Sequence, residues 1–415
     1  MASPRARETC SIATSVDPRR SAGVTRRVLV RVVPLLSIAV LAACASSNAG
    51  EPRAAGRVAA DGQPCDLVVD QAAAATNATF ATIQAAIDAA PGGGTICVTA
   101  GAYAERAHVR SGGTPEHRLV LTALATTTTE GFIVTADNVS IVGFDVTNPG
   151  RADDAGRDYG ISLAGEGLIA ERNHVRSSAA DGIGCEQKPP FCPGAVIRAN
   201  VVERAEGAGI VTYGDAVLIE GNDVSGSTSH HAVDADGIRF HGADVVVRAN
   251  KVHDITSAGY PAGTAPHTDC FQTFPKSGFV PRGNLVVDNL CVRVDDQCLV
   301  ADGEGDDAAG GSGSAVAPSL EFRGNVCQNV GSQAILSRRL PNLRIVGNWF
   351  DRGILYWGVN LQDGGHDAVV TGNTFLGRYR PVLADASSEP GLVVADNVVM
   401  PEPLALVTVR RARAS

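Results

Sequence analysis

Short runs of aliphatic and β-branched residues that end in asparagine recur along the chain. "VSIVGFDV" (139–146) is the first copy, with Phe144 in the asparagine position, and successive asparagines then lie 22 to 39 residues apart. The nine asparagines are Asn173, Asn200, Asn222, Asn250, Asn289, Asn325, Asn348, Asn373 and Asn397. One short strand before each asparagine, without helical spacing between copies, predicts a parallel β-solenoid whose stacked coils bury each other's apolar faces.

A second repeated position lies between the asparagines, in phrases such as "DGIG", "DGIR" and "DCFQ". The spacing from this position to the next asparagine is 12 residues after Ile161, Ile210 and Ile238, so extra residues elsewhere are insertions. The insertions precede the strands of Ile238 and Phe271 and follow those of Ile183, Phe271 and Leu299. Loops at both ends of one strand stack predict a groove over the outward face of that stack.

Strand alternation identifies the residues of the groove floor. If Ile238 and Phe240 point inward, Arg239 and His241 point outward. The same register places further side chains outward on neighbouring coils, namely Tyr213, Gln272, Phe274, Asp302 and Arg338.

The asparagine repeat resembles the right-handed parallel β-helix of the pectin-lyase-like superfamily, over roughly residues 65–400. Asparagine adopts left-handed turn conformations easily, and its amide can bond to the turns above and below, so we expect an asparagine ladder. The fold class expected is all-β, a single-stranded parallel β-helix at 64–402, with its handedness implied by the resemblance. Phe80, Ile83, Ile87 and Ala90 share one helical face, which predicts a helix that caps the first coil.

The N-terminal segment is typical of an export signal. "TRRVLVR" (25–31) is basic, and "VVPLLSIAVLAAC" (32–44) is an apolar run too short to span a membrane. "LAAC" resembles a bacterial lipobox, which implies cleavage after residue 43 and lipidation of Cys44; an ordinary signal peptide is the alternative. We expect a signal peptide at 1–43, a linker at 44–63, a C-terminal tail at 403–415, and a lipid-anchored, extracytoplasmic monomer. The sequence does not distinguish Sec from twin-arginine export.

Removal of the leader makes the chain more acidic. Residues 1–43 contain seven arginines, one aspartate and one glutamate, so cleavage changes the formal net charge from −9 to −14. This charge argues against non-specific binding to nucleic acid. It also requires a local basic patch or a bridging cation if the partner is an acidic polysaccharide.

The remaining eight cysteines predict disulfides, because an even number in an exported chain favours pairing. The repeat suggests that Cys65 pairs with Cys97, and Cys185 with Cys192. Cys270 and Cys298 occupy one position on adjacent coils, as do Cys291 and Cys327, so these two pairs are expected between coils.

Titratable side chains concentrate in one stretch of the predicted groove. Five of the nine histidines lie between residues 230 and 267. The residues selected as catalytic candidates are Arg239, His241, His267, Asp236 and Asp269, with Tyr213, Gln272, Phe274 and Arg338 as candidates for substrate binding. Elimination from a uronate needs a base and a cation or Ca²⁺ at the carboxylate. Arginine is normally protonated, so histidine serves more easily as the base; Asp234 and Asp302 are weak Ca²⁺ candidates.

Two other functions stay open beside the favoured polysaccharide lyase. "HTDCF" and "VDDQCL" resemble marks of polygalacturonases, which hydrolyse glycosidic bonds with paired carboxylates, but His267 and Gln297 depart from that pattern. The chain can also be a non-catalytic glycan-binding β-helix. In that case Asp236 and Asp269 only cap strand starts and Arg239 is a surface residue, because fold alone does not determine chemistry.

Overall fold

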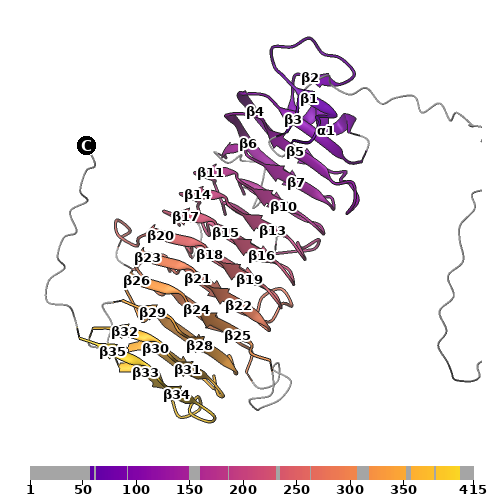
Figure 1. Ribbon diagram of the computed structural model, residues 1–415. Coiled ribbons are helices and arrows are strands. Elements are labelled where there is room, and N and C mark those ends of the chain that lie inside the picture. The colour runs from indigo at the N-terminus through magenta and orange to yellow at the C-terminus, as the bar shows by residue number, and fades with distance from the viewer. Residues whose placement is uncertain are drawn as a thin grey trace, which may run out of the picture. The chain divides into compact units, whose positions relative to one another are not determined.

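The computed structural model describes residues 57–59, 62–90, 92–148, 159–185, 187–229, 234–261, 263–305, 317–351, 357–377 and 380–401. The predicted signal peptide, Cys44, most of the linker and the C-terminal tail lie outside these residues. Within them, the chain forms a parallel β-solenoid with three rows of stacked strands (Figure 1). No helix in this part of the chain has the length and apolar character needed to cross a membrane.

The first row is one 14-stranded sheet that runs along the solenoid. Its strands are β1 (Leu67–Val69), β2 (Thr79–Phe80), β3 (Gly94–Val98), β5 (Leu119–Ala123), β7 (Val139–Val142), β10 (Ile169–Glu171), β13 (Val196–Arg198), β16 (Leu218–Glu220), β19 (Val246–Arg248), β22 (Asn284–Val287), β25 (Leu320–Arg323), β28 (Leu343–Val346), β31 (Val369–Thr371) and β34 (Val393–Ala395).

The second row follows the asparagines. Its strands are β8 (Asp145–Thr147), β11 (His174–Arg176), β14 (Val201–Glu203), β17 (Asp223–Ser225), β20 (Lys251–Ile255), β23 (Leu290–Val294), β26 (Val326–Val330), β29 (Trp349–Phe350), β32 (Thr374–Leu376) and β35 (Val398–Met400).

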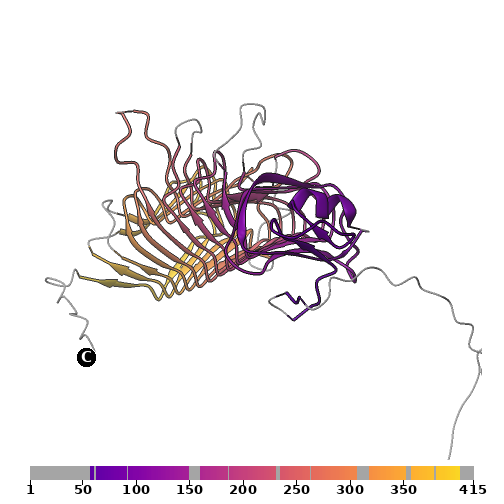
Figure 2. The same ribbon diagram turned by 90° about the horizontal axis from the view of Figure 1, so that it is seen from above.

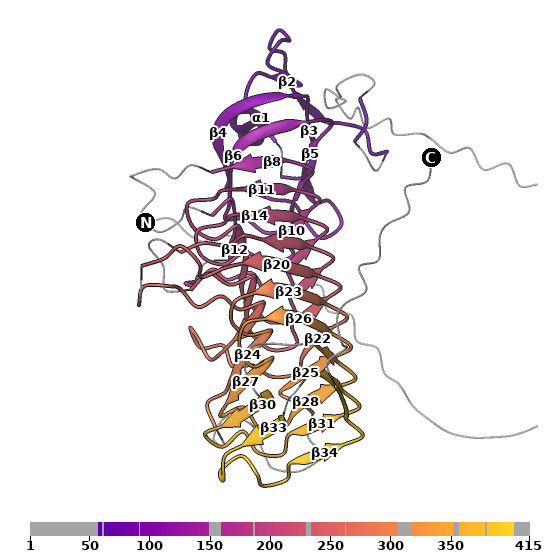
Figure 3. The same ribbon diagram turned by 90° about the vertical axis from the view of Figure 1, so that its left-hand side faces the viewer.

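The third row carries the predicted groove. Its strands are β9 (Ile161–Leu163), β12 (Ile183–Cys185), β15 (Ile210–Tyr213), β18 (Ile238–His241), β21 (Phe271–Thr273), β24 (Leu299–Asp302), β27 (Ile335–Arg338), β30 (Trp357–Gln362) and β33 (Arg380–Ala384). In the first coils, the long strands β4 (Gly101–Val109) and β6 (Thr127–Val134) take the place of separate second- and third-row strands, and β6 pairs with both β8 and β9. Strands of successive coils lie one above another in each row (Figure 3).

The asparagine ladder is confirmed. The amide nitrogen of each asparagine from Asn173 to Asn373 donates to the side-chain oxygen of the next one at 2.9 to 3.2 Å. The same nitrogen also donates to a backbone carbonyl of the preceding coil, as Asn250 does to Ile219 at 2.9 Å. Each buried amide therefore forms hydrogen bonds with polar groups of the adjacent coils, which stabilises the turn between the first and second rows.

The expectation that the asparagines themselves adopt the left-handed turn conformation was wrong. The left-handed residue is the one before each asparagine, such as Ala199 (φ 54°), Gly221 (φ 64°) or Ala249 (φ 53°), and the ladder asparagines are not among the residues with positive φ. The asparagine is thus required by the hydrogen bonds of its amide, while the preceding residue makes the turn.

The N-terminal helix α1 (Ile83–Ala89) is shorter than the pattern suggested. Thr82 is its N-cap and accepts a hydrogen bond from the backbone N–H of Ala85 at 3.1 Å. Phe80, expected on the helical face, lies in β2, while Ile83, Ala86 and Ile87 are buried. The face that α1 buries contacts the first coil, and its role as a cap stays a prediction.

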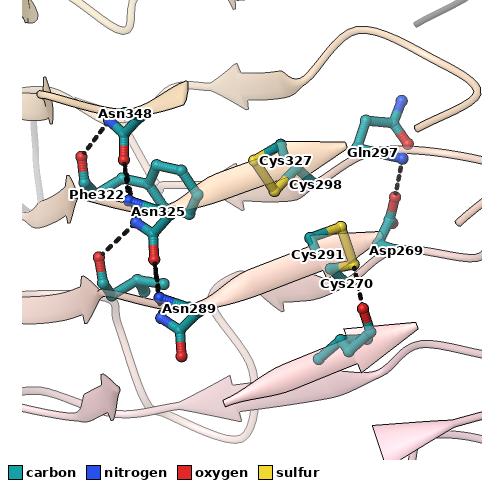
Figure 4. Close-up of a disulfide and its surroundings, with 12 residues drawn as sticks. Asp269, Cys270, Asn289, Cys291, Gln297, Cys298, Phe322, Asn325, Cys327 and Asn348 are labelled. Atoms are coloured by element: carbon teal, nitrogen blue, oxygen red, sulfur yellow. Dashed lines mark hydrogen bonds between the residues drawn. A yellow bond between two sulfur atoms is a disulfide. The ribbon is translucent and has the colours of Figure 1, made fainter. Parts of the chain in front are cut away.

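Four disulfides are present, and two of them differ from the expected pairs. Cys65–Cys97 and Cys185–Cys192 form as predicted. The expected pairs Cys270–Cys298 and Cys291–Cys327 were wrong, because the bonds join Cys270 to Cys291 and Cys298 to Cys327 (Figure 4).

The geometry of the coil explains these two bonds. Cys270 and Cys298 precede third-row strands, whereas Cys291 and Cys327 lie on the second row one coil further along. All four side chains are buried, and both pairs have Cα atoms 5.9 Å apart. Residues in register on adjacent strands point in the same direction, whereas these diagonal pairs face each other across a corner, at a distance typical of disulfides.

Candidate functional site

The middle of the third row holds the side chains that the sequence selected. Ile238 and Phe240 point inward and are fully buried, so the predicted alternation is confirmed and Arg239 lies on the outward face. Its partners in register are Val211 on β15 and Gln272 on β21. A loop of these coils projects from the solenoid (Figure 2), where the sequence has insertions at the ends of the third-row strands.

Arg239 is held by polar groups on three sides. Its Nε donates to Asp236 Oδ2 at 3.0 Å and to Gln272 Oε1 at 2.8 Å. Its Nη2 lies 2.5 Å from Asp236 Oδ2 and 3.3 Å from Asp234 Oδ2. The side chain is only 14% exposed. Burial by itself lowers the pKa of Arg239, but the carboxylates around it outweigh burial and raise that pKa above its usual value. Arg239 therefore stays charged and cannot act as a base.

Asp181, Asp236 and Asp269 occupy the same position before third-row strands, and we call them the aspartate row. Each uses Oδ1 to accept the backbone N–H at that position on the next coil: Ala208 at 2.6 Å, Asp269 at 3.1 Å and Gln297 at 2.9 Å, respectively. Figure 4 shows the last of these bonds. The interpretation of Asp236 and Asp269 as caps of strand starts is therefore confirmed, and it leaves the second carboxyl oxygen of each side chain for other partners.

Burial changes the acidity of the aspartate row. It raises the pKa of Asp181 to about 6, although the charge of Arg239 and the N–H of Ala208 act against it. Burial also raises the pKa of Asp236, against the opposing charge of Arg239. The pKa of Asp269 is raised well above its usual value, by burial and by the negative charge of Asp236, and its Oδ2 is buried without a hydrogen-bond partner. One guanidinium faces several carboxyl groups, so burial and mutual repulsion favour the protonated form of these aspartates.

Two of the expected floor residues are inaccessible. Tyr213 is 1% exposed and His241 is fully buried, although both lie on the outward side of the third row. Burial lowers the pKa of His241 to about 3, so its imidazole is neutral, and burial raises the pKa of Tyr213 to about 12. The expectation that His241 serves as an exposed base was wrong for this conformation, because loops cover it.

The remaining candidates lie around the cluster. Gln272 is mostly buried against Arg239, and His267 is exposed on a loop that pairs with Asp234 through an isolated β-bridge. Arg338 is tied to Asp302, with Nε 3.1 Å from Oδ1 and Nη2 2.8 Å from Oδ2.

A hollow of about 310 Å³ lies near the ends of β21 and β24. Its walls are formed by Phe274, Pro275, Asp302, Gly303, Glu304 and Arg339. Phe274 and Asp302 therefore lie beside an open space on the groove side of the solenoid, as substrate-contacting residues would.

The weak Ca²⁺ candidates Asp234 and Asp302 are engaged by arginines. Within the described residues, no group of three or more histidine, cysteine, aspartate or glutamate side chains could hold a metal ion. Two histidines of the predicted cluster, His230 and His231, lie outside the described residues.

Asp181 is the residue that the choice of site residues missed. It lies two coils before Asp236 in the third row, beyond the stretch of dense histidines on which the selection relied. The signal that could have found it is its position, because "DGIG" places Asp181 where "DGIR" places Asp236.

Comparison with known families and structures identifies the fold. The profile of the right handed beta helix region family matches residues 130–291. A search of curated proteins gave no match. Among solved structures, a tailspike protein mutant of E. coli bacteriophage HK620 in complex with a pentasaccharide is similar, with 13% identity and a TM-score of 0.58. The alignment covers 80% of this chain and 66% of the tailspike chain, slightly less than two thirds of it.

Pectate lyase Pel9A is also similar, with 15% identity and a TM-score of 0.51 over 77% of this chain and 78% of the lyase. These identities are low, so the likeness concerns the fold. Together with the three rows of parallel strands, it shows that this chain is a right-handed parallel β-helix protein with the pectin-lyase-like fold.

Proposed function

We propose that the protein cleaves a polysaccharide by hydrolysis at the cluster formed by the aspartate row, Asp234 and Arg239. The observation that carries this proposal is the half-buried carboxyl group of Asp181, whose pKa is raised by burial to about 6. A protonated carboxyl group beside an ionised one is the pair that glycosidic hydrolysis uses as acid and base. Asp234, half-buried and in contact with Arg239, is the second carboxyl group of this pair.

The spacing of the coils favours inversion at the anomeric carbon. Asp181 and Asp234 lie before β12 and β18, which are two strand spacings apart in the third row. Strands are separated by about 4.8 Å, so the two carboxyl groups are roughly 9 to 10 Å apart along the row. Asp234 lies two residues before the position of the aspartate row on its coil, which adds an offset across the row. Inverting hydrolases need about 6.5 to 9.5 Å to admit water, whereas retaining ones use about 5 to 5.5 Å.

Two comparisons support a glycan as the ligand. The tailspike protein is described in complex with a pentasaccharide, and Pel9A is described as a pectate lyase. Both share the fold of this chain, and an extended face of stacked strands suits an extended polymer.

The test is a screen of neutral and acidic polysaccharides for newly formed reducing ends. We expect cleavage of at least one polymer by the wild-type protein, and a loss of at least about 100-fold in kcat for Asp181→Asn, as is typical for removal of a general acid. Asp145→Asn is the matched control, because Asp145 is an ion-paired aspartate of the second row. Full activity of Asp181→Asn would refute the assignment; binding without cleavage of any polymer would favour the glycan-binding alternative.

Elimination from a uronate, the reaction predicted from the sequence, is the second candidate. It is favoured by His267, an exposed residue whose backbone pairs with that of Asp234, with Arg239 as a clamp for the carboxylate. The product would be unsaturated and would absorb in the ultraviolet, and its formation would fall in His267→Ala. The same assay with and without a chelator tests the Ca²⁺ requirement. Reducing ends without unsaturated product would exclude this reaction.

We also propose that the protein is extracytoplasmic and anchored through a lipid on Cys44. Four disulfides among the described residues support an oxidising compartment. Metabolic labelling with a radioactive fatty acid should mark the wild-type protein, and Cys44→Ser should stay unlabelled. Label on Cys44→Ser would contradict the anchor.

A further inference from the structure

Two loops from coils far apart in the sequence meet above the third row. Residues 187–193 follow β12 and residues 274–282 follow β21, and we call them together the bridge. Ser277 Oγ donates to the carbonyl of Gln187 at 2.9 Å, across 90 residues of sequence. The rings of Phe191 and Phe279 meet edge to face, with centroids 4.8 Å apart. Since β15 and β18 lie between β12 and β21, the bridge crosses the ends of these two strands.

A stack of aromatic side chains lies beneath the bridge. The rings of Tyr213 and His241 are parallel within 17° and 4.5 Å apart, and Phe274 meets His241 edge to face at 4.6 Å. Tyr213 also forms a hydrogen bond with the side chain of Gln187 from the bridge. Tyr213 and His241 are part of the outward surface of the third row, and their side chains are buried where the bridge, which includes Phe274, covers them.

One atom under the bridge has no partner. His241 Nδ1 lies 2.8 Å from the carbonyl oxygen of Phe274, so in the neutral imidazole Nδ1 carries the proton and donates it. Nε2 then carries no proton and can only accept a hydrogen bond, but it is buried and accepts none. A buried acceptor in this state is costly, and a hydroxyl group that donates to Nε2 would remove this cost.

We propose that the bridge is a lid over a sugar subsite formed by Tyr213 and His241. With the bridge open, the edges of these two stacked rings face the groove, so the apolar face of a pyranose ring packs against them and a sugar hydroxyl donates to His241 Nε2. The lone pair of Nε2 disfavours a carboxylate at this position, so the subsite takes an uncharged sugar residue. This inference deepens the proposed function, because His241 lies on the same strand as Arg239, two residues further along.

The nature of the bridge contacts makes opening plausible. Among the described residues, the two loops contact each other through one exposed hydrogen bond and one aromatic contact. The first loop is also held by Cys185–Cys192 and by its bonds to Tyr213, from the backbone of Cys192 and the side chain of Gln187, so opening must break the Gln187 bond as well. Separation of the loops therefore leaves the stacked strands intact. The lid can move without unfolding of the solenoid, as gating loops on rigid scaffolds do.

The test uses a crosslink across the bridge. Gln187→Cys with Ser277→Cys should form a disulfide on oxidation, and the two single variants are controls for the loss of each side chain. The readout is modification of His241 by diethyl pyrocarbonate, followed by mass spectrometry of its peptide. We expect at least a tenfold slower reaction in the crosslinked protein than in its reduced form. Ser277→Ala with Phe279→Ala should react at least tenfold faster than wild type.

The sugar is probed with cellotetraose, which is neutral, and with tetragalacturonate, which is acidic. Cellotetraose should protect His241 in the open variant and should bind the crosslinked protein at least tenfold more weakly. Equal modification rates in the crosslinked and reduced proteins, or absence of protection by cellotetraose, would overturn the proposal. Stronger protection by tetragalacturonate would overturn the assignment to an uncharged residue.

Asp181→Asn separates this proposal from the proposed function. This variant should lose hydrolysis yet retain protection of His241 by cellotetraose. If wild type cleaves no polysaccharide but His241 is still protected, the hydrolytic function fails and the subsite stands.

Discussion

The asparagine ladder and the aspartate row apply the same kind of hydrogen bond to two turns of the coil. In both, a side-chain oxygen accepts the backbone N–H at the equivalent position of an adjacent coil. Asn250 Oδ1 accepts from Asn222 on the preceding coil, whereas Asp236 Oδ1 accepts from Asp269 on the following coil. They differ in the second polar atom. The asparagine amide donates its N–H groups within the ladder, so it needs nothing from outside. A carboxylate only accepts, so its second oxygen needs a cation or a proton.

The difference between the asparagine amides and the aspartate carboxylates shows which positions of a repetitive fold can become a reactive site. The ladder stabilises the solenoid because every polar group in it is satisfied. In the aspartate row, buried carboxyl groups lie near one another and repel, and Arg239 supplies the opposite charge through its ion pair with Asp236. The result is a cluster with raised aspartate pKa values on the outward face of the coil, which is the combination expected at a functional site.

Arg239→Met should have the largest effect, since it removes the cation of the cluster. Asp236 is fully buried, and loss of its partner should lower the free energy of unfolding by about 3 to 5 kcal/mol. Arg248→Met is the control, because Arg248 pairs with Glu220 at the exposed surface of the first row and should change stability by less than about 1 kcal/mol. Denaturant unfolding at pH 7 measures both. Similar values for the two variants would mean that the cluster carries no special electrostatic role.

Asn250→Asp converts one rung of the ladder into a carboxylate. The variant loses the donor to Asn289 and Ile219 and buries a charge, so we expect a loss of about 3 kcal/mol at pH 7. Protonation restores an O–H donor, so part of the stability should return as the pH falls toward 4. Asn397→Asp is the milder control, because Asn397 lies at the end of the ladder and is half-buried. Equal losses in the two variants, independent of pH, would contradict the distinction between the ladder and the aspartate row.

Asp181 should give stability a specific dependence on pH. Its pKa is about 6 in the folded protein against 3.8 for the free side chain, so the folded state favours the protonated form. The corresponding stability is complete below pH 3.8 and is lost as the pH rises through about 6. The unfolding free energy of wild type relative to Asp181→Asn should therefore fall by roughly 1 kcal/mol or more between pH 4 and pH 7. A flat difference would show that Asp181 ionises as in the unfolded chain, and a rising one that its pKa is lowered; both would contradict the account.

Gly221→Ala should have the smallest effect. Gly221 has φ 64° before a ladder asparagine, and an added Cβ would meet nothing within 4 Å, so only backbone strain counts. We expect a loss of about 1 kcal/mol. In Gly324→Ala the added Cβ would lie 2.6 Å from Asp288 Oδ1, so the loss should be larger. Thermal unfolding of both variants ranks them, and the reverse order would contradict the description of the turn.

The sequence was sufficient for the repeated parts of the molecule. The asparagine spacing gave the coils, and the alternation around Ile238 gave the outward position of Arg239. The sequence was insufficient for contacts between residues that are not in register, because such contacts depend on the direction in which each side chain or loop points. The partners of Cys270 and Cys298 lie on the diagonal across a corner, and the loops that cover His241 come from coils on either side of it. Neither relation leaves a periodic signal, and Asp181 was missed because its importance comes from burial beside Arg239.

The most direct test of the account is a carbon-13 NMR titration of the side-chain carboxyl groups, with label on aspartate. We predict a resonance that titrates near pH 6 in wild type, is absent from Asp181→Asn and is unchanged in Asp145→Asn. If every aspartate resonance of the wild-type protein titrates below about pH 4.5, near the ordinary value for aspartate, the aspartate row holds no proton at neutral pH and the proposed site is contradicted.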